Sequence, residues 1–174
     1  MTAKRITEDE CRQLYKEYNT PPHVIRHCEA VSMVAVKIGE ALNKSGLNLD
    51  IDLVKGAGLA HDIARAGDEH WIVGANILED LGYKDEADIV RVHMFYNFNS
   101  FDKLNETDLV CLGDRLVRED EYVGLDVRIE YIINKAGNEP KRTERILESK
   151  KATRGFMDQI EEQIGQTIDS LFVK

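Results

Sequence analysis

The sequence predicts an all-α fold, and three observations support this prediction. Apolar residues recur about every 3.6 positions along most of the chain, which is the period of a helix that buries one face. No segment shows a convincing strand-like alternation of apolar and polar residues. The chain also has only three prolines and contains no internal repeat or low-complexity stretch.

The length favours a single domain. A chain of 174 residues can bury roughly two-thirds of the surface that it exposes when unfolded, so neither a cofactor nor a disulfide is needed merely to fold. We therefore expect one compact helical bundle over residues 1–174.

Three helices are expected in the first third of the chain, each marked by residues at its ends. Thr7 and Glu10 have the spacing of a capping box and open a short first helix. Two prolines at positions 21–22 precede a long helix that ends near Gly46. A third helix begins near residues 50–52 and runs into the His61-Asp62 doublet, and its small residues at positions 56–60 permit close approach of another helix.

The remaining chain is expected to form further helices at about 69–81, 84–95, 106–118 and 124–136, and a last helix of about thirty residues. Gly82 is a typical helix stop, and the Phe-, Asn- and Ser-rich segment 95–105 is expected to be a loop. Residues 137–140 separate a core of about 20–135 from a C-terminal helical extension of about 140–173.

Composition limits the classes of partner and compartment. A net charge of −9 disfavours nucleic acid as a partner, because phosphate backbones are bound mainly by clustered Lys and Arg. A small anionic substrate would instead need local positive charge. The three cysteines lack C-x-x-C spacing, and neither a signal peptide nor a long apolar run is present. We therefore expect a reduced, cytoplasmic protein without a membrane partner.

Polar residues with the chemistry of metal ligands stand where helical periodicity expects apolar ones. Asp114 lies on a stripe with Val110 and Val117, and His27 lies on a stripe with four aliphatic residues. Unpaired ions in such places are costly, so these groups need a common partner. The full series is His27, His61, Asp62, His70, His93 and Asp114.

Imidazole and carboxylate ligands suit divalent ions such as Mn, Fe, Co, Ni or Zn, and the carboxylates also suit Mg. Six candidate ligands are more than one tetrahedral ion uses. Either two ions share the site, or some of the six residues orient the metal ligands without binding metal themselves. One ion would use His27, His61, Asp62 and Asp114. A second would add His93 and His70, with Asp62 as the natural bridge.

The series resembles the HD superfamily of metal-dependent phosphohydrolases, which is named after its His-Asp doublet. The resemblance covers about residues 20–135 and rests on the segments Arg26–Val31, Gly58–Arg65 and Leu112–Leu116. It implies an HD-type helical bundle in which the His and Asp residues of these segments bind metal. The segment His70–Ala75 and His93 also resemble the bacterial dinucleoside tetraphosphate hydrolase branch, although the spacing from the doublet to His70 is shorter here.

The resemblance implies hydrolysis of a phosphoester or phosphoanhydride in a small phosphorylated substrate, most plausibly a nucleotide, by a metal-bound hydroxide. Asp62 could bind metal and also accept a proton from the attacking water. Arg65 and Arg115 could stabilise charge on the phosphoryl group, or could equally form ion pairs that orient the aspartates.

Two other functions remain open from the sequence. One is a di-iron oxygenase built on the same fold, and the other is a non-catalytic domain that senses a nucleotide. The long C-terminal helix could pack on its own domain or on a second subunit, so a homodimer is also open.

Overall fold

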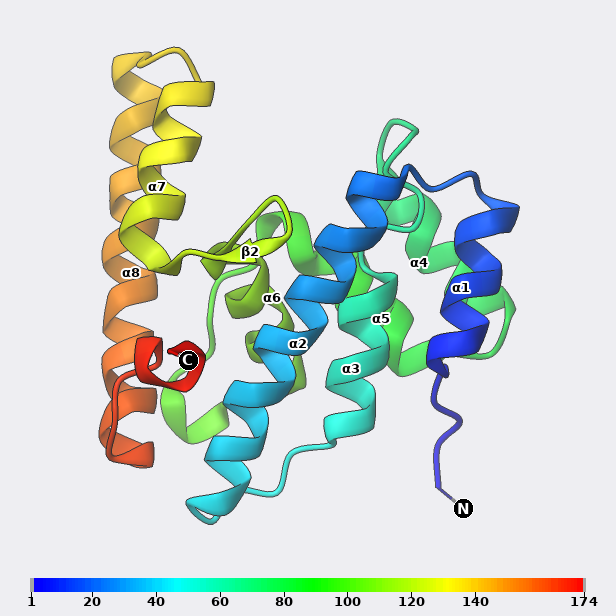
Figure 1. Ribbon diagram of the computed structural model, residues 1–174, viewed down its shortest axis with the longest axis horizontal. Helices are drawn as coiled ribbons and strands as arrows, with labels where there is room; N and C mark the ends of the chain where they lie inside the picture. Colours follow the sequence, from blue (N-terminus) through cyan, green and yellow to red (C-terminus); the bar gives the residue numbers. More distant parts are fainter. Residues whose placement is uncertain (1, 174) are drawn as a thin grey trace.

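The computed structural model describes residues 2–173 and orders the described chain as eight α-helices with short 3-10 turns and one two-stranded hairpin (Figure 1). The α-helices are α1 (Glu8–Glu17), α2 (Pro22–Lys44), α3 (Ile51–Ala60), α4 (His70–Asp80), α5 (Lys84–Val92), α6 (Glu106–Leu116), α7 (Gly124–Lys135) and α8 (Pro140–Ile164). The 3-10 turns are η1 (His93–Phe95), η2 (Phe101–Lys103) and η3 (Asp169–Phe172). The predicted all-α class is confirmed.

The helix ends follow the local signals in most places. The capping box of α1 is present, since the Glu10 amide donates to Thr7 Oγ1 and the Thr7 amide donates to a carboxylate oxygen of Glu10. Helix α2 starts at the second of the two prolines, and Gly82 follows α4 with a φ of 87°. The last helix has 25 residues rather than about thirty, because Gly165 ends it in the left-handed conformation.

Two expectations were wrong in detail. The predicted helix over 84–95 ends at Val92, and His93 begins the 3-10 turn η1. The chain also pairs two short antiparallel strands, β1 (Val117–Arg118) and β2 (Glu121–Tyr122), where the sequence showed no strand. Strands of two residues are too short to produce an alternating pattern.

Helix α2 crosses the middle of the molecule, with α1 toward one end and the paired helices α7 and α8 at the other (Figure 1). Its residues enter two apolar clusters. Val31, Val34 and Ile38 pack in the larger cluster with α6, α7 and α8, whereas Val24 and Cys28 pack in the smaller one with α1, α4 and α5. The first turns of α2 therefore lie where the two clusters meet.

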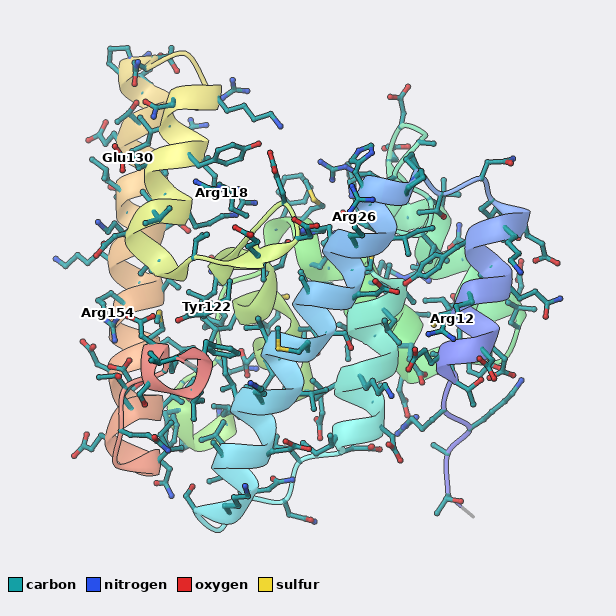
Figure 2. All side chains as sticks on the ribbon, viewed as in Figure 1. Arg12, Arg26, Arg118, Tyr122, Glu130 and Arg154 are labelled. Atoms are coloured by element: carbon teal, nitrogen blue, oxygen red, sulfur yellow. The ribbon has the colours of Figure 1, made fainter. Side chains whose placement is uncertain are left out.

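The C-terminal extension packs on its own domain. Phe156, Met157 and Ile160 of α8 are buried in the larger cluster. The chain then turns back, and Phe172 stacks on Tyr122 of the hairpin with ring centroids 4.0 Å apart, close to the C-terminal turn (Figure 2). Within residues 2–173, no helix combines the length and apolar character needed to cross a bilayer.

Glycines let two helices approach the backbone of α2 closely. A Cβ atom on Gly58 of α3 would lie 2.8 Å from the Cα atom of Ser32, and one on Gly113 of α6 would lie 3.0 Å from the carbonyl oxygen of Val31. Real Cβ atoms are not found at the first of these distances. The predicted close approach at the small residues of α3 is confirmed, and it brings the His61-Asp62 doublet and Asp114 next to the start of α2.

We predict that Gly58→Ala lowers the free energy of unfolding by about 1–3 kcal/mol, because the added methyl group collides with the backbone of α2. Urea unfolding followed by circular dichroism measures the change. Gly155→Ala in α8 is the matched control, since a Cβ atom there would have no neighbour within 4 Å. This control should raise stability by up to ~1 kcal/mol through helix propensity. Equal effects of the two substitutions would contradict the close approach.

Candidate metal centre

The structure brings all six predicted ligands together from five segments of the chain. His27 lies in the second turn of α2, His61 caps α3 with Asp62 next to it, His70 begins α4, His93 begins η1, and Asp114 lies in α6. Their ligand atoms form two groups, and within each group these atoms lie within 4.8 Å of one another. The first group is His27, His61 and Asp114, and the second is Asp62, His70 and His93.

The first group is centred on Asp114. The Nε2 atom of His27 lies 3.0 Å from Asp114 Oδ1, and the Nε2 atom of His61 lies 3.9 Å from the same oxygen. Asp114 is a quarter exposed and His27 somewhat less, whereas His61 is fully buried. The first group is therefore the more open part of the site.

The second group is centred on Asp62, which also faces the first. Its Oδ1 atom lies 3.0 Å from His70 Nε2 and 3.4 Å from His93 Nε2. Its other oxygen, Oδ2, lies 3.7 Å from His61 Nε2. The two oxygens of one carboxylate thus point to different groups, as a bridging ligand requires.

Backbone carbonyls fix the orientation of three histidine rings. The Nδ1 atoms of His27, His61 and His93 lie 2.6–2.7 Å from the carbonyl oxygens of Glu119, Gly58 and Val90 respectively. A carbonyl oxygen can only accept, so each Nδ1 carries a proton and donates it. In the neutral ring the lone pair is then on Nε2, which is the atom that faces the site.

The same contacts explain where two helices end. In a continuing α-helix the carbonyl of Gly58 would accept from the amide of Asp62, and that of Val90 from Met94. The Nδ1–H groups of His61 and His93 donate hydrogen bonds to these two carbonyl oxygens instead. Helices α3 and α5 therefore stop at the ligands, which is the physical reason that the predicted helix over 84–95 was too long.

Three polar atoms in the site are buried without a hydrogen-bond partner, namely His61 Nε2, His93 Nε2 and Asp62 Oδ1. Orphaned polar atoms in a protein interior are uncommon because each loses its hydration. All three carry lone pairs that could bind a cation, and each residue belongs to one of the two ligand groups. Divalent cations would satisfy them, so the residues present fit the ions that the sequence implies.

Burial and mutual charge set the protonation of the ligands. Burial would raise the pKa of Asp62, but the charge of His61 and the close approach of the His70 and His93 rings hold it well below its usual range. Burial would also raise the pKa of Asp114, but the hydrogen bond with His27 and the charges of His61 and His27 together lower it. Both carboxylates are therefore ionised and able to bind a cation.

The pKa values of three of the histidines are shifted in different directions. Burial lowers the pKa of His61, which favours the neutral ring that metal binding needs. Burial would also lower the pKa values of His27 and His93, but the adjacent carboxylates Asp114 and Asp62 outweigh it and raise them. A cation bound at this site would consequently compete with protons on His27 and His93.

The two predicted arginines lie in different places. Arg65 is next to the second group, where its Nη1 atom lies 3.0 Å from His70 Nε2 and 3.8 Å from Asp62 Oδ1. Arg115 is directed away from the ligands. Its guanidinium donates to the carbonyl of Tyr96 and to Thr153 Oγ1 of α8, and it covers the ring of Phe98 at 4.4 Å. The structure brings Arg65 to the site and does not bring Arg115 there.

Sequence reasoning missed the turn of the β1–β2 hairpin as part of the site. Glu119 lies in an acidic run of the sequence, Glu119–Glu121, and its carbonyl orients His27. Its φ of 55° is left-handed, a conformation that glutamate rarely adopts. Asp120 of the same turn pairs with Arg26, which lies on the N-terminal half of α2 (Figure 2). Only a contact between distant segments assigns this role, so no local signal was available.

Asp108 was missed as well. It is fully buried and accepts hydrogen bonds from the Tyr96 hydroxyl and from the amides of Asn99 and Asn105. These bonds anchor the segment that follows His93. The signal that could have found it is the Asn105 to Asp108 capping box at the start of α6, which the structure contains.

We predict that Glu119→Val lowers the free energy of unfolding by about 1–2 kcal/mol, because a β-branched side chain is strained at this φ. Glu119→Gly should equal or exceed the wild-type stability, since glycine adopts the conformation freely. Thermal unfolding measures both. If the two variants were equally stable, the turn would not hold its left-handed conformation in solution.

Comparison with known proteins identifies the family to which this chain is similar. The HD domain family matches residues 24–120, which is more than half of the chain and includes all six candidate ligands. An uncharacterized protein of Methanocaldococcus jannaschii is 39% identical over 71 residues, which cover 39% of this chain and 42% of that protein. The tRNA (cytidine(56)-2'-O)-methyltransferase of Picrophilus torridus is 34% identical over 88 residues, which cover 49% of this chain and 24% of that enzyme.

The matches thus span less than half the length of either relative. No solved structure matches the chain. These relatives do not support the more specific resemblance to the dinucleoside tetraphosphate hydrolase branch. The family match and the two His/Asp groups agree with each other, and the chain belongs to the HD domain family.

Proposed function

We propose that this protein is a metal-dependent phosphohydrolase that cleaves a phosphoester or phosphoanhydride bond in a small phosphorylated molecule of the nucleotide class. The observation that carries the proposal is the pair of ligand groups joined by Asp62. In two-metal phosphatases and nucleases, two ions about 3.5–4 Å apart stabilise the attacking and leaving oxygens.

In the proposed mechanism, the two ligand groups bind the metal ions and orient the attacking water. Divalent ions bound there would lower the pKa of water and neutralise phosphoryl oxygens. His61 and His93 are fixed by carbonyls, so their Nε2 atoms hold their positions without reorganisation. Asp62 remains ionised and faces both groups, so it also orients the attacking water as a hydrogen-bond acceptor.

Arg65 supplies the positive charge for the phosphoryl group. Its side chain is nearly half exposed and already reaches the second ligand group, so it can turn toward an anion that enters there. Arg115 has no part in this mechanism, because its guanidinium is committed to the contacts with Tyr96, Phe98 and Thr153.

A small substrate is favoured over nucleic acid. One relative carries the name of a tRNA methyltransferase, but only 24% of that enzyme is matched. The net charge of −9 on this chain repels a polyanion. A cytoplasmic location and a homodimer are part of the proposal and are not needed for the chemistry.

We predict that the purified protein binds two divalent ions and that substitutions remove them separately. His27→Ala should lose the ion of the first group, His93→Ala the ion of the second, and Asp62→Ala both. Metal analysis by mass spectrometry after gel filtration in zinc counts the ions. His23→Ala is the matched control, because His23 is exposed in the first turn of the same helix. A single ion lost equally in all three variants would contradict the two-ion arrangement.

We predict release of phosphate or of a nucleotide product from mono- or dinucleotides, with full dependence on added metal. Asp62→Ala should lower kcat/KM by roughly a thousandfold, since it removes the ligand shared by both groups. Asp52→Ala, which changes an exposed aspartate of α3, should leave the rate unchanged. Equal rates in wild type and Asp62→Ala would exclude this site as the source of activity. Oxygen consumption by a two-iron form without hydrolysis would favour the oxygenase.

A further inference from the structure

An aromatic pair begins at the second ligand group and continues to the surface. The indole of Trp71 meets the ring of His70 edge-on, with centroids 5.3 Å apart. The ring of Phe95 in turn meets Trp71 edge-on at 5.4 Å. His70 directly precedes Trp71 in the chain, and His93 lies two positions before Phe95. The ring centroids of these two histidines are 5.5 Å apart. The pair is therefore continuous with the candidate metal centre.

Phe95 differs from the other aromatic residues of its segment. Phe98 stacks on Phe156 of α8, and the Tyr96 hydroxyl donates to the buried Asp108. Phe95, by contrast, is 75% exposed. The segment is anchored on both sides of it, since His93 bonds to Val90 and Tyr96 bonds to Asp108 and Arg115. An exposed ring on an anchored turn is preorganised to receive a ligand.

We propose that Trp71 and Phe95 form a subsite that stacks the nucleobase of the substrate, an inference that rests on the proposed phosphohydrolase function. Aromatic faces are complementary to any base, because every base presents a π-face. Arg65 lies against His70 and provides a cation for the phosphate beside the aromatic pair. The site thus combines donors for an anion with rings for a flat aromatic group, and a nucleotide carries both.

The position of the pair favours a base over a protein partner. The rings start at the ligand His70 itself, so a protein seated on them would cover the approach to the second group. Apart from Phe95, the exposed large hydrophobic residues of α4, α5 and η1 are Val73, Val92 and Met94, which are 45%, 40% and 39% exposed. A patch of this extent suits one base rather than a subunit interface.

The chain contains its own probe, since Trp71 is its single tryptophan. Tryptophan fluorescence of the zinc-loaded protein is titrated with the four ribonucleoside 5'-monophosphates and with ribose 5-phosphate, which lacks a base. We expect at least one nucleotide to quench the fluorescence and ribose 5-phosphate to leave it unchanged. Phe95→Ala should raise the dissociation constant of the nucleotide roughly tenfold, whereas Phe95→Tyr and Met94→Ala should keep it within about twofold.

The outcomes separate this subsite from the proposed activity. Absence of quenching by all four nucleotides, or equal binding in wild type and Phe95→Ala, overturns the subsite even if phosphate is released. Quenching that depends on Phe95 in a protein without hydrolysis supports the subsite and removes the proposed catalysis. Gel filtration is run in parallel, and a dimer that Phe95→Ala dissociates would assign the pair to a second copy of the chain and overturn the proposal.

Discussion

The candidate centre depends on the backbone contact of α3 and α6 with α2. Gly58 and Gly113 remove the side chains that would hold these helices apart, and the resulting contacts are at Ser32 and Val31 of α2. His27 lies about one turn before these two residues. Ligands from three helices consequently meet within the reach of short side chains. A wider spacing between α2 and α6 would separate Asp114 from His27, its closest partner.

The centre also determines the helices that build it. His61 and His93 each bond to the carbonyl three residues earlier, which fixes the ring and ends the helix in one contact. The chain can then turn directly after each ligand, and Asp62 and the 95–105 segment follow these turns. At both His61 and His93, one hydrogen bond therefore fixes the orientation of the ligand ring and also ends the helix.

The sequence predicted the features that local chemistry controls. Helix caps such as Thr7 with Glu10, and the polar ligands on apolar stripes, depend on residues a few positions apart. Features set by distant contacts were not predictable. The Glu119 carbonyl reaches His27 across 92 positions, and the Arg115 guanidinium reaches Thr153 across 38. The division of six ligands into two groups has the same origin, since it follows from how the helices pack.

The ligand set balances its own charge before any cation binds. Asp114 pairs with His27, and Asp62 lies against His70 and His93, so each ionised carboxylate has a ring that can carry a proton. The pKa values of His27 and His93 are raised for this reason. The two extensive apolar clusters that form the core contain none of the candidate ligands. A cation bound at these ligands would have to displace protons from His27 and His93.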